Sequence, residues 1–395
     1  MADKNKSTYT LTLLLINLFI AFLGISLVIP VMPTLMNELN ISGTTVGYLV
    51  AVFALTQLFI SPVAGRWTDR FGRKIMIING LLIYSVSEVL FGIGKSVDIL
   101  FISRILGGIS AAFIMPAVTA FIADITTVKT RPKAFGYMSA SISTGFIIGP
   151  GLGGFIAEFG HRVPFFVAAV LGFLAAILSF TTLREPERNY ERDEQSVQIS
   201  GFKKIFTQPY FIPLLIIFIS SFGLAAFESL FSLFTDHKFG FTPKDIAIMI
   251  TGGALIGAIA QVFLFDRLTE WWGEIRLVRY SFIISAILVF MMTVVHTYLT
   301  IMLVTFTVFI GFDLMRPAVT NYLTKIAGNE QGFAGGMNSM FTSIGNVLGP
   351  IVGGFLFDIN LNYPFYFSTL IMLIGIALTL VWKNPKRSKK HFHIE

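Results

Sequence analysis

Five ionisable side chains interrupt apolar stretches that are long enough to cross a bilayer: Glu88, Arg104, Glu228, Asp313 and Arg316. A charged side chain at the bilayer centre costs about 2.5 kcal/mol or more, so such residues usually line a cavity or pair with one another. A carboxyl group held away from water can exchange a proton near neutral pH. These residue types in these surroundings therefore favour proton chemistry inside a membrane.

The two acids of the second half of the chain are the main candidates for proton coupling. Glu228 lies in SFGLAAFESLFSLF and has no basic neighbour on its own helix, which makes it the better proton carrier. Asp313 lies in FIGFDLMRPAVT, and Arg316 follows it by one helical turn. For Asp313 and Arg316, a purely structural ion pair between residues three apart is the alternative.

The two ionisable residues of the first half are more ambiguous. Glu88 lies towards the outer end of its stretch, where a wet rim would solvate it. Arg104 also lies near an outer end, in SRILGGISAA. We expect one of three roles for Arg104: a counter-ion for a carboxylate, a proton-relay element, or a side chain that extends to the membrane surface.

The composition identifies the solvent around these residues as lipid. The chain of 395 residues is 54% hydrophobic and only 13% charged, whereas soluble domains carry about 25% charged residues. Its mean hydropathy is +0.77. We predict an all-α polytopic membrane protein with twelve transmembrane helices. The expected spans are 9–31, 44–64, 75–94, 98–120, 134–157, 163–183, 210–235, 245–265, 276–296, 299–320, 334–357 and 364–382.

Most Lys and Arg residues fall into alternate loops, on the side that also holds both ends of the chain. The excess of basic residues in cytoplasmic loops then predicts two cytoplasmic termini in a bacterial plasma membrane. The net charge of +7 serves this topology rather than nucleic-acid binding. Cysteine is absent, which excludes disulfides and thiolate metal sites. We expect no cofactor and no metal.

An internal repeat divides the chain. GFIIGPGLGGF at Gly145–Phe155 returns as GNVLGPIVGGF at Gly345–Phe355, six spans later and so in the same direction. This predicts two pseudo-symmetric six-helix bundles with substrate between them. The expected parts are a bundle at 1–183, a cytoplasmic linker at 184–208, a bundle at 209–383 and a cytoplasmic tail at 384–395.

The repeated glycines suggest close helix contact. Gly145, Gly149 and Gly153 form one smooth face, and Pro150 kinks the helix beside it. Ordinary packing and a sliding surface between the halves both fit this pattern.

The segment GRWTDRFGRK, Gly65 to Lys74, looks like a tight cytoplasmic turn in which Asp69 stands between glycines. The later segment DRLTEWWGE repeats the spacing with Glu270 and Gly273. An acid so placed could meet a helix N-terminus or an arginine and latch one half to the other.

These motifs resemble the major facilitator superfamily. GRWTDRFGRK resembles the superfamily signature between spans 2 and 3. ISRILGGISAA and GFIIGPGLGG are similar to narrower signatures of its drug/proton antiporters, and LGISLVIPVMP to its twelve-span subgroup. FALTQLFISP, SFGLAAFESLFSLFT and FIGFDLMRPAVTNY resemble the NorA and Bmr type of multidrug efflux pump. The resemblance implies proton-driven export of amphipathic, often cationic compounds such as quinolones and dyes, with Glu228 and Asp313 as the proton-linked acids. The resemblance also implies a gating role for Asp69, Arg70, Gly72 and Arg73, and we expect Gly65, Arg104, Gly149 and Pro150 to take part in gating as well.

A pump for varied lipophilic cations needs a roomy apolar cavity with aromatic faces and a negative charge. The expected substrate contacts are Phe22, Gln57, Phe146, Phe227, Phe309, Arg316 and Asn338, with Met337 beside them. The partners are then hydrophobic cations, protons and lipid, and we expect a monomer. Within the same superfamily, a carrier for one small metabolite or sugar is the alternative. A membrane-embedded enzyme is disfavoured because HExxH, GxSxG and GxxxxGK[ST] are absent, and the two-half repeat favours a carrier over a channel.

Overall fold

The computed structural model describes residues 2–127, 130–186, 210–327 and 331–382. These residues form helices and no strands, and twelve helical segments are long and apolar enough to span a membrane. The predicted fold class is therefore confirmed. Most of the predicted linker at 184–208 and the tail at 384–395 lie outside the described residues. The helices are α1 Ala2–Leu27, α2 Met32–Glu38, α3 Gly43–Phe71, α4 Arg73–Ile93, α5 Val97–Ile125, α6 Arg131–Ile156, α7 Val163–Thr182, α9 Phe211–Phe239, α10 Pro243–Trp272, α11 Glu274–Val294, α12 Tyr298–Ala327, α13 Gln331–Ile359 and α14 Tyr363–Val381.

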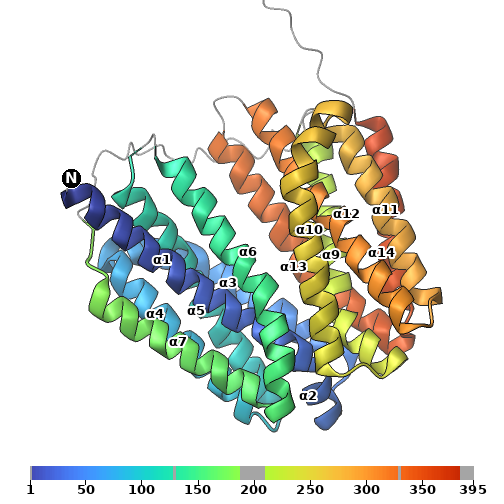
Figure 1. Ribbon diagram of the computed structural model, residues 1–395, viewed down its shortest axis with the longest axis horizontal. Coiled ribbons are helices and arrows are strands. Elements are labelled where there is room, and N and C mark those ends of the chain that lie inside the picture. Colours follow the sequence, from blue (N-terminus) through green and yellow to red (C-terminus); the bar gives the residue numbers. More distant parts are fainter. Residues whose placement is uncertain (1, 128–129, 187–209, 328–330, 383–395) are drawn as a thin grey trace, which may run out of the picture.

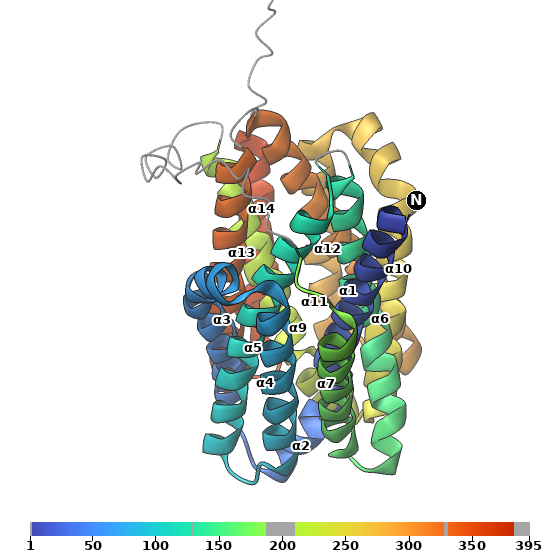
Figure 2. The ribbon, with the colours of Figure 1, turned by 90° about the vertical axis from the view of Figure 1, so that its left-hand side faces the viewer.

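The first half, α1–α7, and the second half, α9–α14, lie side by side (Figures 1 and 2). The first span is broken near its end by a short 3-10 turn at Ile29–Val31, after which α2 continues. The N-terminus and the turn between α3 and α4 mark one end of the molecule, which we call the basic end. The starts of α3 and α10 and the ends of α6 and α13 mark the opposite end, which we call the closed end.

The two polar turns at the basic end are shorter than predicted. α3 continues through Phe71, and only Gly72 separates it from α4; α10 continues through Trp272, and only Gly273 separates it from α11. Both glycines have positive φ, 107° and 74°, a conformation that costs glycine little and other residues much. The sequence expectation was wrong because loss of hydrophobicity marks the membrane surface and does not by itself end a helix.

The repeated glycines contact the helix next to them in their own half. Side-chain carbons at Gly149 and Gly153 would lie 2.6 Å and 1.8 Å from carbonyl oxygens of Leu23 and Leu27 on α1. In the second half, a Cβ at Gly349 would lie 2.6 Å from the carbonyl oxygen of Phe222 on α9. The sliding-surface interpretation of this face therefore differs from the structure, in which it holds each half together.

Other small residues of the same repeat face the opposite half. A Cβ at Gly154 on α6 would lie 2.7 Å from the carbonyl oxygen of Pro243 on α10. A Cβ at Gly354 on α13 would lie 2.3 Å from the carbonyl oxygen of Gly43 on α3. A Cβ at Gly47 would lie 2.1 Å from the carbonyl oxygen of Pro350. The repeated helix thus has two glycine surfaces, one for its own half and one for its partner.

Polar contacts between the halves also gather at the closed end. The N–H groups of Gly43 and Thr44 donate to the Asp358 carboxylate, over 2.6 Å and 2.9 Å. Its counterpart in the repeat, Glu158, pairs with Lys244 at 2.8 Å. Each acid ends one repeated helix and meets the start of a helix in the other half.

At the basic end, the hydrogen bonds and ion pairs between described residues all stay within one half. Gly136 on α6 and Gly336 on α13 have no atom of another element within 4 Å of where a Cβ would lie. The structure is therefore closed at one end of the interface and open towards the basic end.

We expect Gly47→Ala to weaken the closed end, because the new methyl group would overlap the Pro350 carbonyl, 2.1 Å away. The chain has no native cysteine, so Glu158→Cys and Lys244→Cys can report closure through a short bismaleimide cross-link. Cross-linking should fall by about tenfold if the overlap costs about 1.4 kcal/mol. Gly136→Ala is the matched control, and equal cross-linking in both variants would contradict this account.

Candidate functional site

Glu228 lies near the middle of α9 in the second half. Its side chain is exposed, although its neighbours on α9 at 226, 227, 230 and 231 are buried. It interacts electrostatically with Asp313 and Arg316 on α12. Both acids predicted for proton coupling therefore come from facing helices of the second half and share one electrostatic environment.

Asp313 is half-buried against α10, where a Cβ at Gly257 would lie 2.0 Å from its Oδ2. Glycine at that position is what lets the carboxyl group fit between α10 and α12. Among the described residues, Asp313 has no ion pair within 4 Å, with the exposed Arg316 or any other group. The structural ion pair that the spacing allowed is therefore not formed in this conformation.

A cavity of about 170 Å³ opens in the first half. It brings together three predicted substrate contacts, Phe22 on α1, Gln57 on α3 and Phe146 on α6. The rings of Phe22 and Phe146 lie 5.3 Å apart and tilted. The sequence analysis missed the rest of the lining, since apolar residues at helical spacing look alike whether they face a cavity, lipid or core. Those residues are Ala21, Ile25, Phe53, Tyr84, Gly107, Ser110, Ala111, Ile114 and Met115.

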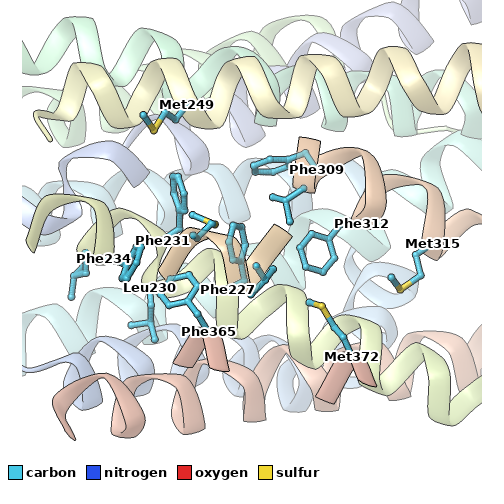
Figure 3. Close-up of a cluster of buried hydrophobic side chains, with 14 of the residues drawn as sticks. Phe227, Leu230, Phe231, Phe234, Met249, Phe309, Phe312, Met315, Phe365 and Met372 are labelled. Atoms are coloured by element: carbon cyan, nitrogen blue, oxygen red, sulfur yellow. The ribbon is translucent and has the colours of Figure 1, made fainter. Parts of the chain in front are cut away.

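Phe227 and Phe309 do not line this cavity. Phe227 is 1% exposed, and its ring centroid lies 5.7 Å from that of Phe312 and 5.9 Å from that of Phe365. Phe309 is also buried in this cluster, which Figure 3 shows between α9, α12 and α14. The structure thus assigns both rings to the core of the second half in this conformation, next to the acids rather than at an open surface.

Asn338 also lies apart from the cavity. Its Nδ2 donates to Thr320 Oγ1 over 3.4 Å, which ties α13 to α12. The amide therefore points towards a neighbouring helix, as expected for a polar side chain within a span, but its contact lies within the second half and not at the cavity.

At the basic end, Arg73 forms a three-helix junction. Its guanidinium pairs with Asp124 at 2.8 Å and with Asp69 at 3.1 Å, and it also donates to the carbonyl of Thr68. Asp69 is 66% exposed. Arg73 therefore joins α3, α4 and α5 within the first half, and the expected latch from Asp69 to the other half is not engaged here.

Glu185, which follows α7 in the chain, caps the N-terminus of α4. The N–H groups of Arg73 and Lys74 donate to Glu185 over 2.6 Å and 2.9 Å. A Cβ at Gly72 would lie 2.9 Å from the Glu185 carboxyl carbon, so this glycine is needed for both its backbone angle and the space. The sequence analysis missed Asp124 and Glu185, because their partners are far away in the chain. Of the remaining predicted gating residues, Arg70 is exposed and Gly65 has open space beside it.

A match to the Major Facilitator Superfamily model covers residues 14–328 and, again, 214–394. The chain belongs to the major facilitator superfamily. The second match begins in the second half, in keeping with the internal repeat.

Curated relatives match over nearly the whole chain. The chain is 73% identical to Multidrug resistance protein 1 of Bacillus subtilis (strain 168), over 97% of this chain and 99% of that protein. It is 44% identical to Quinolone resistance protein NorA of Staphylococcus aureus (strain MRSA252), over 95% of this chain and 96% of that protein.

Solved structures share the fold at low identity. A bacterial homologue of the human lysosomal transporter Spinster, in an inward-facing and occupied conformation, matches with a TM-score of 0.79 and 17% identity. That match covers 95% of this chain and 96% of the other. The nucleoside transporter NupG matches with a TM-score of 0.76 and 15% identity, over 94% of this chain and 98% of the other. These likenesses show the superfamily fold alone.

The contrast between Phe146 and Phe227 can be tested. Phe227→Ala should destabilise the fold by about 3–5 kcal/mol, because it empties a packed core position. Phe146→Ala should leave stability nearly unchanged and raise the KM for ethidium efflux by about tenfold, the value of about 1.4 kcal/mol of lost ring contact. Thermal unfolding of the purified variants, read beside efflux in cells at matched expression, separates the two. A stable Phe227→Ala protein would contradict the core assignment.

Proposed function

We propose that this protein exports amphipathic, often cationic drugs and dyes in exchange for protons. The observation that carries this is the Glu228 carboxyl group, which is exposed in the middle of a membrane-length helix, interacts electrostatically with Asp313 and Arg316, and has no ion pair within 4 Å among the described residues. The high identity to multidrug and quinolone resistance proteins supports the same class of substrate.

The cavity in the first half supports apolar, aromatic substrates. Its lining is almost entirely apolar, with Gln57, Ser110 and Tyr84 as the polar contributors. A sugar or another polar metabolite would need many directional hydrogen bonds, which this lining does not offer. Drug-sized ligands, in contrast, bind mainly through apolar and aromatic contact with a few polar groups.

Alternating access follows from the two ends of the interface. With the basic end open, a lipophilic cation enters and is attracted by ionised Glu228 and Asp313. Separation of the closed end, including the Asp358 and Lys244 contacts, then exposes the site to the other side of the membrane. A proton on Glu228 or Asp313 removes the negative charge, weakens the hold on the cation and accompanies the return.

The basic end is assigned to the cytoplasm on the distribution of Lys and Arg. On this proposal both termini are cytoplasmic in a bacterial plasma membrane, and the present conformation is inward-open. We further propose that the halves act as the predicted domains, with the Arg73 junction and Gly149 and Pro150 maintaining the first half as one body. We also propose that the carrier acts as a monomer and has no enzymatic activity.

The proton-coupling assignment predicts a loss of proton-driven efflux in two near-isosteric variants. Glu228→Gln and Asp313→Asn should each lower proton-driven ethidium efflux by about tenfold or more, because the neutral amide neither attracts the cation nor carries a proton. The measurement is efflux from energised cells with and without an uncoupler, together with proton uptake in proteoliposomes. Asp98→Asn, an exposed acid at the start of α5, is the control. Undiminished coupling in both variants would refute the assignment.

A further inference from the structure

The first half contains a buried acid that the proposed cycle does not use. Glu88 on α4 is 4% exposed, so the wet rim expected from the sequence does not exist in this structure. Its Oε2 is buried without a hydrogen-bond partner in the described part of the chain. An unpaired buried carboxylate is costly, whereas the protonated group is far less so. The Glu88 carboxyl group must therefore either hold a proton or have a positive charge close to it.

Two serines next to Glu88 and Arg104 join α4 to α5. Ser87 Oγ donates to the carbonyl of Ser103 over 2.8 Å, and Ser103 Oγ donates back to the carbonyl of Ser87 over 2.8 Å. This reciprocal pair clamps α4 to α5 at one height. The residues that follow each serine, Glu88 and Arg104, are therefore held at the same level of the bundle.

Arg104 is the cation beside Glu88. It interacts electrostatically with Glu88 and with Tyr84, which lies one turn before Glu88 on α4. Its guanidinium carbon nevertheless lies 4.2 Å from the centroid of the Phe91 ring, and no ion pair within 4 Å joins it to Glu88. A cation on an aromatic face is a favourable but weaker arrangement than a direct ion pair. Arg104 is thus close to the acid while bound elsewhere.

The other ionisable group that contacts this end of α4 has partners of its own: Arg162, directly before α7, donates to the carbonyls of Gly92 and Gly94 and pairs with Glu38. The α7 helix, Val163–Thr182, contains no ionisable side chain. On α5, Asp98 lies in the first turn and is exposed. The groups that face Glu88 are therefore Arg104 from α5 and Tyr84 from its own helix.

The cluster adjoins the substrate cavity on both helices. Tyr84, whose hydroxyl group is also buried without a partner in the described residues, lines the cavity on α4. Gly107 lines it on α5, one turn from Arg104. A change in the position of Arg104 would consequently alter the packing around Tyr84 and Gly107, which line the cavity.

We propose that Glu88 is a second proton-binding site, in the first half of the carrier, and that Arg104 is the counter-charge of its ionised form. When Glu88 holds a proton on its carboxyl oxygen, Arg104 rests on Phe91, as in this structure. When the proton leaves, the carboxylate attracts Arg104 away from the ring and towards α4. This inference extends the proposed proton exchange to the first half, but titration of Glu88 does not depend on which substrate is carried.

The test begins with a measurement that needs no transport. A pH-difference infrared spectrum of the full-length protein in lipid should show the carboxyl band of Glu88, and Glu88→Gln should remove it. Asp98→Asn should leave that band in place. Arg104→Lys, which keeps the charge but changes its reach, should move the midpoint of that band. An unchanged band in Glu88→Gln would overturn the proposal, as would a midpoint that does not respond to Arg104→Lys.

A second measurement addresses the coupling. Tetraphenylphosphonium efflux in proteoliposomes is measured at a series of pH values. If Glu88→Gln removes one proton equilibrium, the change in efflux rate per pH unit should become smaller by up to about tenfold. If Glu88→Gln is poorly folded, Glu88→Asp retains a titratable group and should shift the infrared midpoint instead. Failure of the proposed drug export would abolish efflux in the unmodified protein and leave the infrared result intact. Failure of this inference would leave efflux intact with an unaltered pH profile.

Discussion

The cost of a charge in hydrocarbon is the constraint on which this structure depends. Glu88, Arg104, Glu228, Asp313 and Arg316 interrupt helices that are otherwise apolar enough to sit in lipid. The surroundings of the three acids differ: Glu228 is exposed beside Asp313 and Arg316, Asp313 fits against a glycine on α10, and Glu88 is buried on one of a pair of helices joined by two serines. The helices around these groups are arranged to accommodate them.

The repeated glycine helix shows how two halves can be both firm and separable. One glycine surface lets α6 and α13 approach the backbone of their own half, at distances that a side chain would forbid. The second surface meets the other half only at the closed end. Without a strong hydrophobic drive between helices in lipid, this close backbone contact supplies much of the packing. The same helix therefore packs against its own half on one surface and against the other half on the second.

Carboxylates at helix N-termini organise both ends of the molecule. Glu185 caps α4 within the first half, and Asp358 caps α3 across the interface. The free N–H groups at a helix start and the helix dipole make each contact favourable for an anion. The first cap joins two segments of one half, whereas the second joins the two halves to each other. The Asp358 contact therefore stabilises the closed end of the interface.

The sequence by itself determined the membrane-spanning helices, their number and the repeat, because hydrophobic length and duplicated motifs are local properties that need no partner. It also singled out the ionisable residues, since a charge in an apolar stretch is visible without coordinates. Tertiary structure alone decided which phenylalanines line a cavity: Phe146 does and Phe227 does not, although both lie on apolar helices. It also paired Arg73 with Asp124 and Gly43 with Asp358, and buried Glu88 beside Arg104. These facts depend on how helices distant in the chain are rotated and packed against each other, and no single helical segment carries that information.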